Sequence, residues 1–203
     1  MPASLEEMFQ KQLNNPNETI GQQYSYLKDM DMVPTMSLEY LPSGVEGQYN
    51  NWGNTLKINP DAGSLKNAFS HELQHAVDHA HARQYTQISN KSDKTPDDYR
   101  FLDAVKKFDE PSNIPKGDLN SYRSAPNERQ AYGVANMNYA GGEYRGTPHM
   151  DATEATQQAI LHDLALRSLK GTPIVKAKKN EPDVIDKVFS HPVDLIRDMF
   201  TPK

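Results

Sequence analysis

The segment His71-Glu72-Leu73-Gln74-His75 holds two histidines and a glutamate at a spacing that can do metal chemistry. On a helix, residues four apart are separated by about 40° around the axis and about 6 Å along it. Both imidazoles can therefore reach one Zn²⁺ at about 2.0–2.1 Å. Glu72 lies beside the ligands, where it can act as general base toward a water whose pKa zinc lowers to about 7. The alternative is an exposed, histidine-rich helix face without a metal.

An apolar stripe indicates that this motif belongs to a helix packed against a core. Apolar residues recur at steps of three and four, at Leu65, Phe69, Leu73, Ala76 and Ala80. This period predicts a helix over about residues 64–83. The neighbouring stripe carries His71, His75 and His79, so we expect the histidine face to lie at the floor of a cleft. His79 itself is interpreted as a partly exposed residue at the cleft edge.

Other elements must surround this helix. Short runs bounded by Pro and Gly predict three strands, at 36–41, 46–50 and 55–59. Capping patterns and amphipathic spacing predict further helices at about 4–13, 19–29, 96–108, 126–140 and 151–171. With these elements, the expected fold class is α+β.

The composition fits a globular domain and restricts the ligands of any metal. The chain has 203 residues, 24% of them charged, a mean hydropathy of −0.81 and no cysteine. Its length is sufficient to bury a core without disulfides. Without thiolates, a metal site must be built from histidines and carboxylates.

The charge and the hydropathy argue against two kinds of partner. The net charge is −5, and a mildly acidic chain binds nucleic acid poorly. No apolar run approaches the roughly 18 residues of a membrane helix, and the N-terminal residues lack the pattern of a signal peptide. We therefore expect a soluble protein, with no nucleic-acid or membrane partner, that is cytoplasmic or is packaged or exported without a classical signal peptide.

On these residues, the chain resembles the zincin metallopeptidases. The segment TLKINPDAGSLKNAFSHELQHAVDH looks like their strand, connection and active-site helix, and the resemblance covers about residues 36–141. It implies a short mixed sheet packed on the active-site helix, with a peptide or protein substrate along an edge strand. It also implies Zn²⁺ held by His71 and His75, with Glu72 as the base that activates water to cleave a peptide bond.

The third zinc ligand has two candidates. The first is Glu128, because gluzincins take a glutamate from a second helix, often in an Asn-Glu-x-x-Ala context, and Asn127, Glu128 and Ala131 resemble that pattern. The gluzincin aspartate expected four residues after the glutamate is replaced by Tyr132. We favour Glu128, and the resemblance is thus gluzincin-like.

The second candidate is His81, which has the spacing of the third histidine in metzincins. Their helix breaks at a glycine between the second and third histidines, and here Asp78 occupies that position. The alanines that follow favour a continuous helix. In a continuous helix, His81 would be about 9 Å along the axis and about 120° around it from His75. It could not then share the metal.

Hydrolysis also needs a donor for the developing oxyanion. Tyr132 is our candidate for this catalytic role, since it would share a helix with Glu128; Tyr139, Tyr144 and His149 are the alternatives. Asp78 is open to two interpretations, either a residue that orients a ligand imidazole or a solvated charge.

The C-terminal region extends beyond a minimal zincin domain. We predict a zincin-like domain at 1–171, followed at 172–203 by a linker and amphipathic helices. Residues 182–201 could dock on a protein partner. This feature supports the alternative to a zinc-dependent hydrolase, a structural or virion assembly component that keeps a zincin-like fold.

Overall fold

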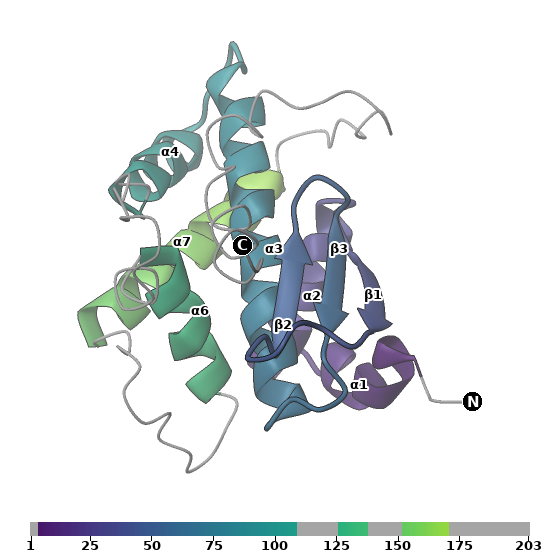
Figure 1. Ribbon diagram of the computed structural model, residues 1–203. Helices are drawn as coiled ribbons and strands as arrows, with labels where there is room; N and C mark the ends of the chain where they lie inside the picture. Colours follow the sequence, from purple (N-terminus) through teal and green to yellow (C-terminus); the bar gives the residue numbers. More distant parts are fainter. Residues whose placement is uncertain (1–3, 109–125, 138–151, 171–203) are drawn as a thin grey trace, which may run out of the picture. The chain divides into compact units, whose positions relative to one another are not determined.

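The computed structural model describes residues 4–108, 126–137 and 152–170. Its elements are α1 (Leu5–Leu13), α2 (Thr19–Asp29), β1 (Thr35–Leu38), β2 (Gly47–Asn50), β3 (Thr55–Ile58), α3 (Leu65–Ser89), α4 (Pro96–Phe108), α6 (Pro126–Met137) and α7 (Ala152–Leu169). The fold is α+β, with a small mixed sheet and several helices, as the sequence predicts (Figure 1).

The chain divides into two compact units. Unit 1 comprises 1–78 with 131–146, and unit 2 comprises 79–130 with 147–203. Both α3 and α6 have residues in each unit. The predicted domain boundary at residue 171 stays a prediction, because 172–203 lie outside the described residues.

The sheet of unit 1 has three strands in the order β1-β3-β2. The central strand β3 pairs in parallel with β1 and antiparallel with β2, so β2 is an outer strand of this sheet (Figure 1). Asn54 holds the β2–β3 turn with a φ of 45°, a conformation that asparagine tolerates well. Its side chain accepts a hydrogen bond from the Tyr49 hydroxyl and donates to the carbonyls of Met32 and Val33. One residue therefore fixes both the hairpin and the entry to β1.

The N-terminal half of α3 is surrounded by the other elements of unit 1. Phe69 stacks on Phe9 of α1, with ring centroids 4.5 Å apart. On the α2 side, Gln74 accepts a hydrogen bond from Gln23. Leu73, Ala76 and Ala80 of the predicted stripe are fully buried, whereas Leu65 at the first turn is only partly buried.

The end of α3 was predicted wrongly. The predicted helix stops near Arg83, but α3 continues to Ser89. No proline or glycine interrupts residues 84–89, and Ile88 extends the buried side of the helix with no exposed surface. Tertiary burial thus maintains helix in a segment whose β-branched Thr86 and Ile88 have modest helix propensity.

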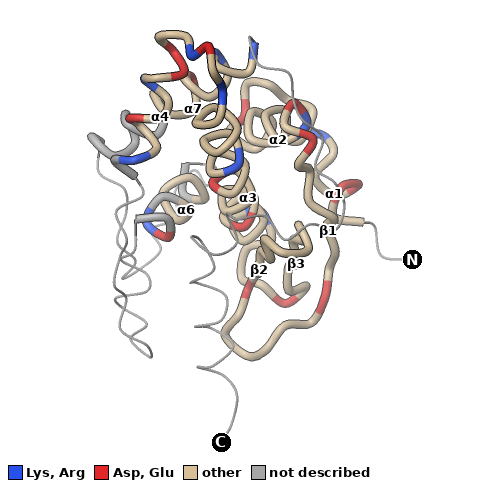
Figure 2. The backbone as a smooth tube through the Cα atoms, turned by 90° about the horizontal axis from the view of Figure 1, so that it is seen from above, with Lys and Arg blue, Asp and Glu red and all other residues tan. Residues whose placement is uncertain are grey.

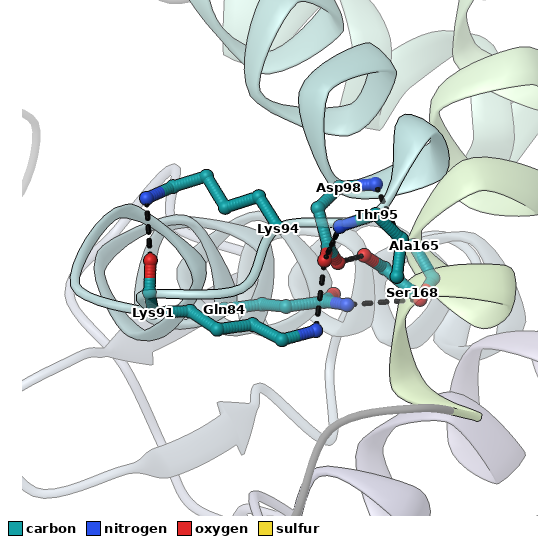
Figure 3. Close-up of polar contacts among 7 residues, drawn as sticks. All are labelled: Gln84, Lys91, Lys94, Thr95, Asp98, Ala165 and Ser168. Carbon is teal, nitrogen blue, oxygen red and sulfur yellow. Dashed lines mark hydrogen bonds and ion pairs between the residues drawn. The ribbon is translucent and has the colours of Figure 1, made fainter.

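In unit 2, α4 packs against α7 around a buried carboxylate, that of Asp98 (Figure 3). The backbone N–H of Thr95 and the ammonium of Lys91 donate to Asp98 at 2.7 and 2.8 Å, and the Ser168 hydroxyl of α7 donates to its other oxygen. The Thr95 hydroxyl accepts in return from the Asp98 N–H. This reciprocal pair caps α4 at the start that Thr95-Pro96 predicts.

The charges on α4 and on the connection before it are of both signs (Figure 2). The exposed pair Arg100–Asp97, at 3.3 Å, is typical of them. Such a pair contributes at most about 1 kcal/mol to stability, so the stability of this part of unit 2 depends on the buried Asp98 cluster. Among the described helices, none has the length and apolarity needed to cross a membrane.

Candidate metal centre

His71 and His75 direct the same type of ring nitrogen toward each other. They lie one turn apart on α3, and their Nε2 atoms are 3.1 Å apart. The two rings are almost perpendicular, at 84°. Two ligands of one tetrahedral zinc are separated by about 3.3 Å, given zinc–nitrogen distances of about 2.0–2.1 Å. The pair is therefore spaced as two ligands of one ion would be.

Glu128 joins this pair from α6. It follows Pro126 in the first turn, and its side chain is 1% exposed. The ligand atoms of His71, His75 and Glu128 all lie within 4.8 Å of one another. A carboxylate buried to this degree needs compensating charge or donors, and a cation held with the two imidazoles would supply that charge.

The donor set fits a divalent transition metal. Two imidazoles and one carboxylate are ligands that zinc accepts, and three protein ligands leave a fourth position for water or substrate, as catalytic zinc sites do. A hard cation such as Ca²⁺ would need more oxygen ligands. The buried group formed by His71, His75 and Glu128 could hold a metal ion.

Tyr132 follows Glu128 by one helical turn and packs on the first histidine. Its ring centroid lies 4.4 Å from that of His71, with the planes tilted by 55°. The helix that carries Glu128 is thus in direct contact with the ligand helix through Tyr132. Four residues after Glu128, the chain thus places an aromatic ring against His71.

Glu72 lies against the outer strand β2. Its side chain is 7% exposed. A Cβ added to Gly47 would lie 2.6 Å from Cγ and 2.9 Å from Oε1 of Glu72, so a side chain at position 47 would displace the carboxylate. The sequence predicts the strand but not this role of Gly47, because the close approach depends on how β2 packs on α3.

The other histidine candidate for the metal lies elsewhere. His81 continues the same helix and is not a member of the group. Its ring centroid is 6.2 Å from those of Phe101 and His162, both in unit 2. Burial, and next the charge of His162, lower the pKa of His81 to about 3. His81 is therefore a neutral core residue at ordinary pH.

Several predicted residues cannot be placed. Tyr139, Tyr144 and His149 lie outside the described residues, as does the predicted docking segment 182–201. His79 is partly buried on α3, as predicted, and its place at the edge of a cleft stays a prediction.

Asp78 has a defined place next to the second histidine. Its Oδ2 is 4.0 Å from Nδ1 of His75, and its Oδ1 accepts a 2.8 Å hydrogen bond from Gln74. Gln74 in turn accepts a 2.6 Å bond from Gln23 on α2. Gln–Asp pairs four residues apart are a known helix interaction, so the Gln74–Asp78 contact could have been predicted from spacing. The contribution of Gln23 could not.

Comparisons with known proteins identify no relative of this chain. Protein-family models, curated protein sequences and solved structures all give no match to the chain. The functional argument therefore rests on the geometry of the site.

Proposed function

We propose that the protein is a zinc-dependent hydrolase with a zincin-like domain, and that it cleaves peptide bonds. The observation that carries the proposal is the buried group of His71, His75 and Glu128, whose ligand atoms lie within 4.8 Å of one another. Zinc bound there would polarise the substrate carbonyl and make water acidic enough to attack near neutral pH. The resemblance to gluzincins supports zinc as the metal and a peptide bond as the substrate.

Glu72 is the general base in this proposal. It directly follows His71 in the sequence, and its buried side chain lies against Gly47 of β2. It takes a proton from the attacking water and delivers it to the departing amine, so that the C–N bond breaks while a C–O bond forms. The strand β2 beside it is where an extended substrate would align.

Tyr132 is proposed as the oxyanion donor. Its ring lies against His71, so its phenol is anchored beside the metal ligands. A hydroxyl donor that is already positioned costs no reorganisation during reaction. Tyr132→Phe keeps the ring packing and removes only the hydroxyl, which makes it the matched variant for this role.

The first test is metal content combined with hydrolysis, on the full chain. We expect one zinc per wild-type chain, no zinc in Glu128→Ala, and normal zinc in His81→Ala, measured by elemental analysis. Glu72→Gln should keep its zinc and lose cleavage of a diverse peptide mixture followed by mass spectrometry.

Two outcomes would count against the proposal. If wild type takes up no zinc even when zinc is supplied, the metal site is wrong. If zinc binds but no peptide or protein is cut, the proposed hydrolase activity is wrong. A structural role in an assembly then becomes the better explanation. Co-purifying partners or stable rings in size analysis would then support that role.

A further inference from the structure

We propose that Asp78 is a positioning residue that holds the His75 imidazole with Nδ1 protonated and Nε2 directed at the metal, and that Gln74 and Gln23 hold Asp78 in turn. The inference rests on the proposed metal site. It assigns a role to residues that are neither ligands nor base, and it places the orienting aspartate on the ligand helix itself.

The orientation of His75 leaves one nitrogen for each partner. Its Nε2 faces Nε2 of His71 at 3.1 Å. Its Nδ1 therefore points to the other side of the ring, where Oδ2 of Asp78 lies 4.0 Å away. This distance is longer than a hydrogen bond, so the carboxylate acts on the ring through its charge. A carboxylate on that side favours a proton on Nδ1, which leaves the Nε2 lone pair available for a metal.

The amides of two glutamines fix the other oxygen of Asp78. The Gln74 amide donates to Oδ1 at 2.8 Å, which leaves Oδ2 directed toward His75. The Gln23 amide donates to the Gln74 carbonyl oxygen at 2.6 Å. Each hydrogen bond fixes which end of the next amide is the oxygen, so the series has one direction, from α2 to the aspartate.

The two glutamines that hold Asp78 are both buried. Gln23 and Gln74 are 4% and 2% exposed. Buried amides cost free energy relative to apolar side chains unless their hydrogen bonds are satisfied. Leucine would fill either position at lower cost, so the glutamines are best explained by the carboxylate that they orient.

The surroundings of Asp78 strengthen its influence on His75. Tyr26 of α2 is fully buried, and its pKa is raised well above the ordinary value, first by burial and next by the charge of Asp78. The charge of Asp78 therefore reaches a buried group of α2. Its side chain remains 25% exposed, which lessens the cost of keeping it ionised.

The test uses the metal-free full chain labelled with ¹⁵N. Long-range ¹H–¹⁵N spectra distinguish the two imidazole tautomers, and a His75→Gln variant assigns the signals. We expect the Nδ1–H tautomer in wild type and a shift toward Nε2–H in Asp78→Ala. Asp163→Ala is the control, since this exposed aspartate lies on α7, where it pairs with Arg167. The tautomer is read without metal and without any substrate.

Zinc affinity, measured by competition with a chromogenic chelator, is the second readout. We expect Asp78→Ala to bind zinc about 10–100-fold more weakly, as is typical when the partner of a ligand is removed. The double variant Gln23→Leu/Gln74→Leu keeps Asp78 but removes the amides that hold it, and its zinc affinity should fall by a smaller factor than in Asp78→Ala. It also keeps the test decisive should Asp78→Ala fail to fold.

The outcomes separate this inference from the proposed function. Unchanged tautomer and unchanged zinc affinity in Asp78→Ala would overturn the role of Asp78, even in an active zinc enzyme. Absence of zinc binding in wild type would overturn the proposed function, and the tautomer would still decide whether Asp78 orients His75.

Discussion

Among the carboxylates that the described part of the chain buries, Asp98 on α4 and Glu128 on α6 have contrasting surroundings. Asp98 is enclosed by donors: an ammonium, a hydroxyl and a backbone N–H. Glu128 is grouped with two imidazoles, whose ring nitrogens can present lone pairs in the same direction. A carboxylate among donors is fixed as an anion and stabilises the fold. A carboxylate among lone pairs is suited to accept a cation. Similar burial can therefore serve structure in one place and chemistry in another.

The largest effect is expected from removing the charge of Glu128, which tests whether its role differs from that of Asp98. In Glu128→Gln we expect zinc affinity to fall about 1,000-fold, since three ligands share roughly 10–16 kcal/mol in protein zinc sites. The metal-free protein should change its free energy of unfolding by no more than about 1 kcal/mol. Chelator competition and urea unfolding measure the two quantities. A large loss of stability without loss of zinc binding would mean that Glu128, like Asp98, stabilises the fold and does not bind the metal.

The reciprocal change is Asp98→Asn, which should cost stability and leave zinc binding intact. Burial raises the pKa of Asp98, but hydrogen bonds from Lys91, Ser168 and Thr95 outweigh it and lower the pKa to about 2. Removing the charge leaves Lys91 without its counterion, at a cost on the order of 3 kcal/mol. Urea unfolding at pH 7 measures the loss.

The pH dependence checks the same carboxylate. Its folded pKa lies below the unfolded value of about 3.9, so its stabilisation is present above that value and is lost as the pH falls toward 2. The difference between wild type and Asp98→Asn should therefore shrink in that range. A difference that does not vary with pH would contradict the account.

A smaller effect is expected from Gly47→Ala. The added Cβ would meet Cγ of Glu72 at 2.6 Å and displace the base. We expect the turnover rate to fall about 10–100-fold, because a misplacement of about 1 Å costs that much in catalysis, with zinc content unchanged. Gly53→Ala is the matched control, since its Cβ would approach nothing closer than Thr55 Cγ2 at 3.4 Å. Equal activity in both variants would show that Glu72 is not the base.

The smallest effect concerns His81. Its folded pKa of about 3 lies below the unfolded value of about 6.5, so the unfolded chain binds more protons in between. Stability should therefore fall as the pH drops below 6.5, by at most about 1.4 kcal/mol per pH unit from this residue. Urea unfolding of metal-free protein at pH 7, 6 and 5 should show a shallower slope in His81→Leu. Identical slopes would mean that His81 is not buried as a neutral residue.

Local chemistry predicts part of this molecule well. The bounds of α2 and α4 agree with the sequence prediction, and the Ser4–Glu7 capping box is present at the start of α1. His71 and His75 meet because both belong to one helix, whose geometry is independent of the rest of the fold. The prediction that Glu128 would join them came from a resemblance, and the structure brings the three together.

What the sequence could not predict depends on contacts between distant elements. The last turns of α3 are maintained by burial of Ile88, and Gly47 matters only because β2 passes over Glu72. Gln23 approaches Gln74 across 51 positions of the chain. Residue type and spacing give no measure of such approaches, since they arise from packing.

The tight contact at Gly47 has a consequence for the evolutionary record. If Glu72 is the base, a lineage that keeps it in place has little freedom at position 47, because every other residue adds a Cβ that would meet its side chain. A lineage that abandons catalysis but keeps the metal for stability would release this constraint first, while both histidines persist. In homologues, we expect Gly47 and Glu72 to be kept together or lost together. Their joint presence would indicate an active enzyme, and their joint loss an inactive one.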